Sequence, residues 1–239
     1  MAAIPRTYIE NFTKVINAMS ADAQDKIAKA LQGVSLEDVA YARDEIISIM
    51  DAILGPYTDN VAAVSAMFYD GLREWYGISD GFAADAVSMR DPAATDGAVR
   101  AFMETVVEGR PYDELYNLLF ERADYEMKRA ANECVAENCK RDPRKPKWAR
   151  VPTGMDTCEF CIMLASRGFS YQSAEVASHA HANCDCRIVP SWDKEDPAVQ
   201  GYDPDKYYDM YRNPDEYPEL REARNARRRE LRQERKESE

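Results

Sequence analysis

Residues 110–150 read RPYDELYNLLFERADYEMKRAANECVAENCKRDPRKPKWAR, and the predicted organisation of the chain depends on the change inside this segment. Its first thirty residues follow a helical period, with Leu115 and Leu119 on the apolar face and an expected end near Cys139. From Lys140 the segment is basic and holds two prolines, which cannot continue a helix. We therefore expect a helical region that ends near residue 139, followed by a different kind of structure.

The residues before this segment also predict amphipathic helices. Ser20 is a candidate cap for a second helix, the segment Ser35-Leu36-Glu37-Asp38 resembles a capping box that opens a third, and Gly55-Pro56 is expected to stop that helix. Asp91-Pro92 is expected to start another helix, which ends at Gly109. No apolar run of about 18 residues occurs, so the sequence predicts no membrane span and no membrane partner.

The charge is concentrated in this helical region. Residues 1–139 carry 24 acidic and 12 basic side chains, a net charge of 12 − 24 = −12, equal to the net charge of the whole chain. An acidic body of this kind is not expected to coat nucleic acid, so any contact with DNA would be local.

The fold class predicted is mainly α: a helical N-terminal region, a small zinc-stapled α+β module and an extended, Arg/Glu-rich tail. The module is expected to contain short strands near residues 150–151, 169–171 and 186–190, and residues 202–218 are expected to be extended. The predicted division is an acidic helical domain at 1–139, a basic linker at 140–150, a Cys/His module at 151–193 and an extended, charged tail at 194–239.

The chemistry of the chain is concentrated in the Cys/His module. Cys158-Glu159-Phe160-Cys161 is followed, after 17 residues, by His179-Ala180-His181-Ala182-Asn183-Cys184-Asp185-Cys186. Thiolates and imidazoles at this spacing are typical ligands of a tetrahedral zinc ion. The predicted ligands are the pair Cys158 and Cys161, with a second pair drawn from His181, Cys184 and Cys186. His179 is expected to lie outside the metal-binding set.

The cluster also has interpretations other than zinc. A metal-free packed Cys/His cluster remains an alternative. A redox dithiol is not favoured because no Trp precedes Cys158 and no βαβ pattern surrounds it. Disulfides are not usual in a cytoplasmic chain. A zinc deaminase would need a His-x-Glu before a Pro-Cys-x-x-Cys, and neither feature is present.

Three segments of the module carry a resemblance to a known family: Thr157-Cys158-Glu159-Phe160-Cys161, Leu164-Ala165-Ser166-Arg167-Gly168, and His181-Ala182-Asn183-Cys184-Asp185-Cys186-Arg187 with Val189-Pro190 after it. Together they resemble the C-terminal signature of the Mu F-like minor head proteins of tailed bacteriophages, in a form similar to that of actinobacterial phages and prophages. The resemblance covers about residues 148–193.

The resemblance implies a structural minor capsid protein in the virion or procapsid, assembled in the host cytoplasm. It implies the phage portal protein and other head proteins as partners, a role in head morphogenesis and DNA packaging or delivery, and no small-molecule substrate. A head maturation enzyme is less favoured, because the only two histidines belong to the metal candidate and leave none for a Ser–His pair.

The alternative function is a zinc-module protein that binds nucleic acid, including packaged DNA. It depends on the basic segment, where Arg144, Lys145 and Lys147 are the candidate phosphate contacts beside Trp148, and on the arginines of the tail.

Overall fold

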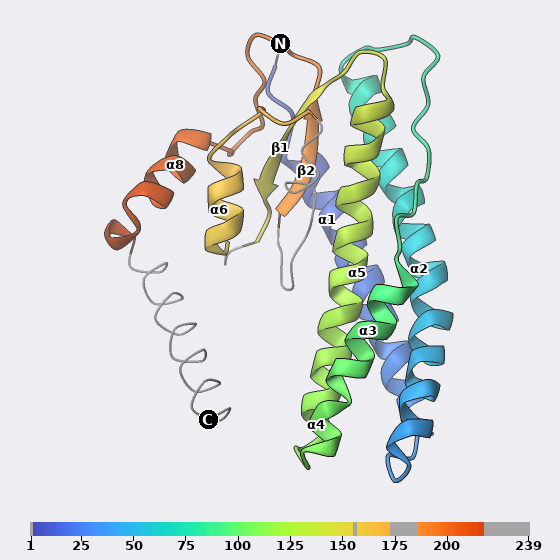
Figure 1. Ribbon diagram of the computed structural model, residues 1–239. Coiled ribbons are helices and arrows are strands. Elements are labelled where there is room, and N and C mark those ends of the chain that lie inside the picture. Colours follow the sequence, from blue (N-terminus) through green and yellow to red (C-terminus); the bar gives the residue numbers. More distant parts are fainter. Residues whose placement is uncertain (1, 155–156, 173–185, 218–239) are drawn as a thin grey trace.

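The computed structural model describes residues 2–154, 157–172 and 186–217, and it is mainly helical (Figure 1). Its elements, in chain order, are α1 (Arg6–Leu31), α2 (Val39–Trp75), α3 (Pro92–Phe102), α4 (Glu104–Val107), α5 (Tyr112–Arg141), β1 (Lys147–Pro152), α6 (Glu159–Ala165), β2 (Cys186–Ser191), α8 (Pro204–Arg212) and the 3₁₀ turn η1 (Pro214–Glu216). Within these ranges, no helix is both long enough and apolar enough to cross a bilayer.

The long helices α1, α2 and α5 pack together as a bundle, with α3 and α4 against α5 (Figure 1). The apolar residues of α5 recur every four positions at Leu115, Leu119, Ala123 and Met127, and all four are completely buried. This spacing places them on one face of the helix, which explains why α5 forms where the sequence predicts it.

Three expected helix boundaries are wrong. Ser20 does not cap a second helix but lies inside α1, where its hydroxyl donates to Asp124 of α5 at 2.8 Å. Pro56 does not stop α2, because buried residues on both sides keep the helix packed. The N-cap of α2 is Asp38 rather than Ser35.

Other local signals are confirmed. Asp91 caps α3, with Pro92 in its first turn, and Gly109 takes a positive φ of 72° after α4. Two of the three expected strands also form, and the third, at 169–171, is reduced to a single bridge at Tyr171. β1 and β2 pair antiparallel from Lys147 opposite Ser191 to Pro152 opposite Cys186, and Tyr171 bridges to Trp148 on the other side of β1.

The basic segment 140–150 takes part in two regular elements. Its first two residues belong to α5, and its last four belong to β1, where Trp148, Ala149 and Arg150 are buried. Only residues 142–146 connect the two elements. The strands lie between the bundle and α6 (Figure 1), and one continuous hydrophobic core joins residues of all three.

The chain after β2 is not extended as expected. Asp203 caps α8 and Pro204 occupies its first turn, the same signature that starts α3. Before it, Val199 and Ile4 form a parallel bridge, and the Tyr202 hydroxyl donates to the carbonyl of Ala165. Residues up to 202 therefore belong to the core, whereas the expected Arg/Glu-rich segment 219–239 lies outside the described residues.

Candidate functional site

The structure brings two of the predicted zinc ligands together. Cys161 lies in α6 and Cys186 begins β2, and their Sγ atoms are 2.7 Å apart in a fully buried position. Cys158 is the N-cap of α6, where its sulfur accepts the Cys161 backbone N–H at 3.3 Å. The short helix thus places the two sulfurs of the Cys-x-x-Cys segment at the same end.

Two side chains that the sequence analysis did not select hold Cys186 in place. Asn132 of α5 donates to the Cys186 carbonyl at 3.2 Å and accepts the Ile188 backbone N–H at 3.1 Å, which fixes β2 against the bundle. The Arg150 guanidinium donates to the Cys186 sulfur at 3.5 Å and is completely buried. Asn132 could have been selected from the sequence, because it is a polar residue on the face of α5 that is otherwise apolar and buried.

A positive charge lies beside the Cys186 sulfur. It belongs to the Arg150 guanidinium, which is not exposed to solvent. A guanidinium beside a sulfur favours the anionic thiolate, which is the form that binds metals. The donor set is therefore chemically suited to zinc.

The distances fit a zinc centre only in part. Zn–S bonds of about 2.3 Å in a tetrahedron place two sulfurs about 3.8 Å apart, so Cys161 and Cys186 would separate by about 1 Å around a metal ion. In the described part of the chain, no group of three or more His, Cys, Asp or Glu side chains forms a metal-binding cluster. His179, His181 and Cys184 lie outside that part, so the zinc centre stays a prediction.

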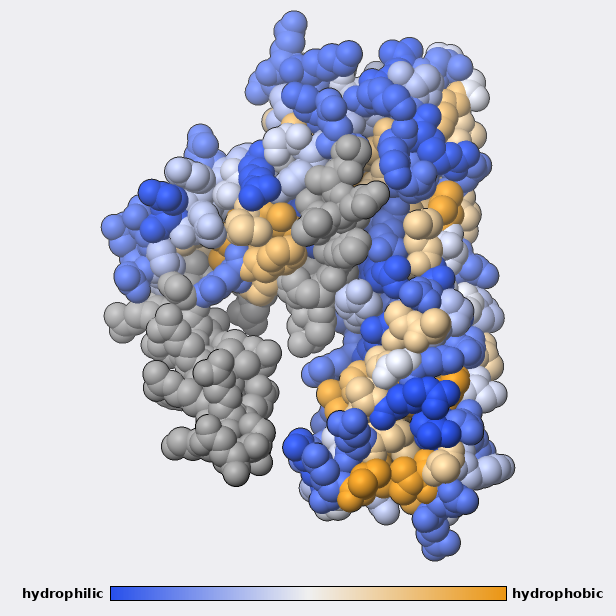
Figure 2. Space-filling view, in the orientation of Figure 1, coloured by the Kyte–Doolittle hydropathy of each residue, from blue (hydrophilic) through white to orange (hydrophobic). Residues whose placement is uncertain are grey.

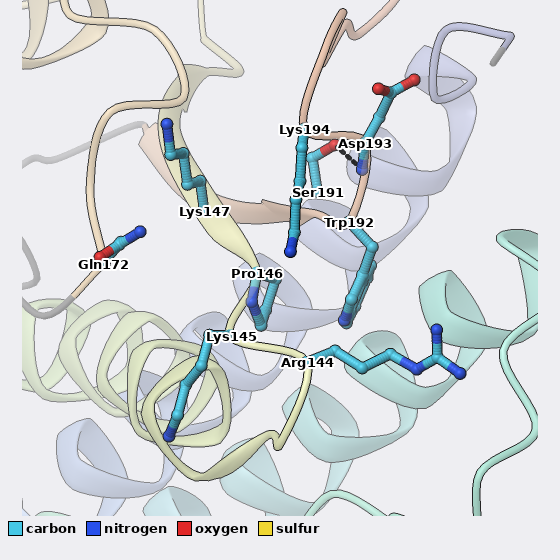
Figure 3. A pocket seen from close by; sticks show the side chains of 9 residues that line it. All are labelled: Arg144, Lys145, Pro146, Lys147, Gln172, Ser191, Trp192, Asp193 and Lys194. Atoms are coloured by element: carbon cyan, nitrogen blue, oxygen red, sulfur yellow. Dashed lines mark hydrogen bonds between the residues drawn. The ribbon is translucent and has the colours of Figure 1, made fainter.

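A second candidate site is a pocket of about 250 Å³ beside the start of β1 (Figure 3). We call it the basic pocket, and its lining residues are Arg144, Lys145, Pro146, Lys147, Gln172, Ser191, Trp192, Asp193 and Lys194. It thus contains all three of the predicted nucleic-acid contacts, together with Lys194, which the sequence analysis did not select.

Two of the three predicted contacts are already engaged within the protein. Arg144 forms an ion pair with Asp80, and its guanidinium lowers the pKa of that carboxyl. Lys145 donates to the backbone carbonyl of Lys140 at 2.6 Å. Figure 3 shows both side chains directed away from Lys147 and Gln172.

Two residues that line the basic pocket, Arg144 and Trp192, are held by Asp142, which follows α5 and is completely buried. Its carboxylate accepts the Trp192 indole N–H at 3.1 Å, the Arg144 backbone N–H at 2.7 Å and the Tyr69 hydroxyl at 3.0 Å. It also pairs with Arg73 of α2, whose side chain is 3% exposed. This network joins the bundle to the residues that follow β2.

One family model matches most of the chain. Residues 3–214 match the family model described as VG15 protein. The chain belongs to the VG15 protein family. Its relatives include the Gene 15 protein of Mycobacterium phage D29, which is 33% identical over 29% of this chain and 38% of its own length. The Gene 15 protein of Mycobacterium phage L5 is 31% identical over 28% of this chain and 37% of its own length.

The VG15 match and these two relatives show a phage protein family. The aligned region covers less than two fifths of either phage relative. The resemblance to Mu F-like minor head proteins is not confirmed by these matches. No solved structure gives a significant match to the chain.

Proposed function

We propose that this VG15 family member is a structural minor capsid protein that associates with the phage portal and acts in head morphogenesis and DNA packaging or delivery. The observation that carries the proposal is the family match over residues 3–214, with relatives encoded by two mycobacteriophages. The resemblance of residues 148–193 to the Mu F-like signature supports the assignment to the head.

The bundle offers a surface that suits a protein partner. Figure 2 shows apolar side chains gathered at the lower end of the bundle, near α4. Val107 of α4 and Tyr112 at the start of α5 are 73% and 53% exposed, and Phe102 and Val106 are partly buried beside them. A cluster of exposed apolar side chains among polar residues is typical of a protein interface. We call Phe102, Val106, Val107 and Tyr112 the bundle tip and propose that the portal protein covers this surface.

Zinc is part of the same proposal. Cys158, Cys161 and Cys186 would supply thiolates, with His181 or Cys184 completing the set, and the bound ion would join α6 to β2. Structural zinc contributes on the order of 10 kcal/mol to the folding of small metal-binding modules. Its role here would be to hold the module on the bundle, because the segment between α6 and β2 is long and the two elements meet at these sulfurs.

The test is co-expression of the full chain, tagged, with the portal protein of the same phage genome. We expect the two proteins to copurify, with about one zinc ion per VG15 chain by metal analysis of the same sample. The double substitution Val107→Asp, Tyr112→Ser should abolish copurification, and Met67→Asp is the control because Met67 is equally exposed but lies on α2.

Failure of the wild-type chain to associate with portal or any other head protein would contradict the proposed function. Equal loss in the double variant and in the Met67→Asp control would contradict the bundle tip as the interface. Absence of zinc from protein purified under reducing conditions would contradict the metal centre and leave the metal-free cluster.

The alternative of broad nucleic-acid binding through Arg144, Lys145 and Lys147 has less support. The ion pair of Arg144 and the backbone contact of Lys145 leave Lys147 as the one predicted contact with no hydrogen bond or ion pair among the described residues. The net charge of −12 also opposes the approach of a polyanion.

A further inference from the structure

We propose that the basic pocket binds a single phosphate group, held by the ammonium groups of Lys147 and Lys194 and by the amide of Gln172. The phosphate would belong to a nucleotide or to a nucleic-acid strand end or backbone. This inference goes beyond the proposed head function and assigns the site to residues that the sequence analysis left out, Gln172 and Lys194.

The first argument is the unbalanced charge of the pocket. Arg73 is paired with Asp142 and Arg144 with Asp80, and the Lys145 ammonium group donates to a backbone carbonyl. Across the ranges that the structure describes, no carboxylate lies within 4.0 Å of the Lys147 or Lys194 ammonium group, although acidic residues outnumber basic ones in the chain. Two ammonium groups that line the basic pocket without a carboxylate partner favour the binding of an anion.

Among the described residues that line the pocket, Asp193 is the one acidic residue, and its carboxylate forms hydrogen bonds elsewhere. The Asp193 carboxylate accepts the backbone N–H groups of Glu195 and Asp196 at 3.0 and 3.1 Å, and these bonds help to lower its pKa to about 2. Figure 3 shows this carboxylate directed away from Lys147 and Gln172. It therefore forms a turn that carries Lys194 rather than neutralising the pocket.

The second argument is that strand pairing and side-chain contacts fix the residues that line the pocket. Lys147 and Ser191 are opposite each other in the β1–β2 ladder, so the two strands set the positions of Lys147 and of the turn after Ser191. Trp192 is fixed by its bond to Asp142 and by edge contacts with Tyr69 and Tyr76. A cavity with such walls needs little reorganisation when it binds a ligand.

The backbone beside the pocket is strained as well. Lys145 has a φ of 48°, and it is the one described residue other than glycine with a positive φ. A positive φ is unfavourable for a residue with a side chain and is often found at binding sites. Here it turns the chain between α5 and β1, so that Pro146 and Lys147 form one wall of the pocket.

The ligand chemistry follows from the donors. Ammonium and amide N–H groups donate hydrogen bonds, so they suit a tetrahedral anion with several acceptor oxygens. Lysine is also a common phosphate ligand. A cavity of about 250 Å³ exceeds the size of one phosphate group and leaves room for an attached sugar. The acidic body disfavours a long stretch of duplex along the surface, so a single phosphate is the fitting unit.

The experiment is calorimetric titration of the full chain with three probes: inorganic phosphate, adenosine monophosphate and a 20-base-pair duplex. The test variant is Lys147→Gln, Lys194→Gln. The matched control is Lys14→Gln, Lys29→Gln, which removes the same charge from exposed positions of α1. Thermal melting of each variant checks that the fold is retained.

We expect phosphate and adenosine monophosphate to bind the wild-type chain and the control alike, and to bind the test variant at least about 10-fold more weakly, as for the loss of charge-assisted hydrogen bonds. If the duplex also binds, with a log–log salt slope of about −2 for two contacts, the source is nucleic acid. If inorganic phosphate and adenosine monophosphate bind but the duplex does not, the phosphate group that the pocket binds belongs to a nucleotide.

Two results would overturn the inference. One is that none of the three probes binds the wild-type chain. The other is that the control variant weakens binding as much as the test variant does, because the effect would then be that of net charge rather than of this pocket. Association with head proteins is measured separately and does not depend on either result.

Discussion

Removal of the Asp142 charge should destabilise the protein strongly, because this carboxylate lies completely buried between the bundle and the residues after β2. We consider Asp142→Asn, which keeps the shape of the side chain. The Arg73 guanidinium, 3% exposed, would lose one of its two carboxylate partners, and the amide would present N–H groups toward donors such as the Trp192 indole. A buried cation left without its partner is costly because the protein interior solvates it poorly.

The magnitude can be worked from the contacts. Breaking a buried ion pair by removing one partner costs about 3–5 kcal/mol. Arg73 retains its pair with Asp80, whose side chain is 24% exposed, so we expect the lower end, about 3 kcal/mol. For a chain of this length, 1 kcal/mol lowers the melting temperature by about 2–4 °C, so the expected decrease is about 6–12 °C.

Urea denaturation at pH 7, followed by circular dichroism and by tryptophan fluorescence, measures this change. The matched control is Asp44→Asn, which removes one member of the solvent-exposed Arg43–Asp44 pair and should leave stability unchanged within error. A loss below about 1 kcal/mol for Asp142→Asn, or equal effects in the two variants, would refute the argument that this network joins the two parts of the fold.

Three further predictions follow from the packing. Gly168 has a φ of 56°, and a Cβ there would lie 3.3 Å from Pro204, so Gly168→Ala should cost about 1–2 kcal/mol in urea denaturation, whereas Gly97→Ala in the open face of α3 should be neutral or stabilising. A chain that ends at Tyr217 should melt at the wild-type temperature, and a chain that ends at Trp192 should melt lower because it lacks part of the core; equal melting of the two would contradict the fold. Burial raises the pKa of the Cys139 thiol, so native protein at pH 8 should not be alkylated there, and labelling detected by mass spectrometry before unfolding would contradict its burial.

The boundaries that could be predicted from the sequence are those set by local chemistry. Asp91-Pro92 starts α3 because the carboxylate satisfies a backbone N–H at the helix end, and proline fits the first turn. The apolar spacing of α5 is likewise contained in one segment of chain. The mainly helical fold and the approximate positions of both strands could therefore be inferred without tertiary structure.

The errors arose where contacts between distant residues outweigh a local signal. Ser20 stays inside α1 because it bonds to Asp124, and Pro56 stays inside α2 because buried residues on either side keep the helix in the core. The same holds after β2, where Val199 pairs with Ile4 near the other end of the chain. No window of sequence contains both members of any of these pairs.

The candidate sites divide in the same way. The spacing of Cys158 and Cys161 is a local pattern, so the cysteine cluster could be selected from the sequence alone. Cys161 contacts Cys186 because α6 packs on β1, which pairs with the strand that Cys186 begins, and Lys147 and Lys194 line one pocket because β1 and β2 pair antiparallel. Local chemistry set where helices and strands begin, and packing between distant segments decided which side chains share a site.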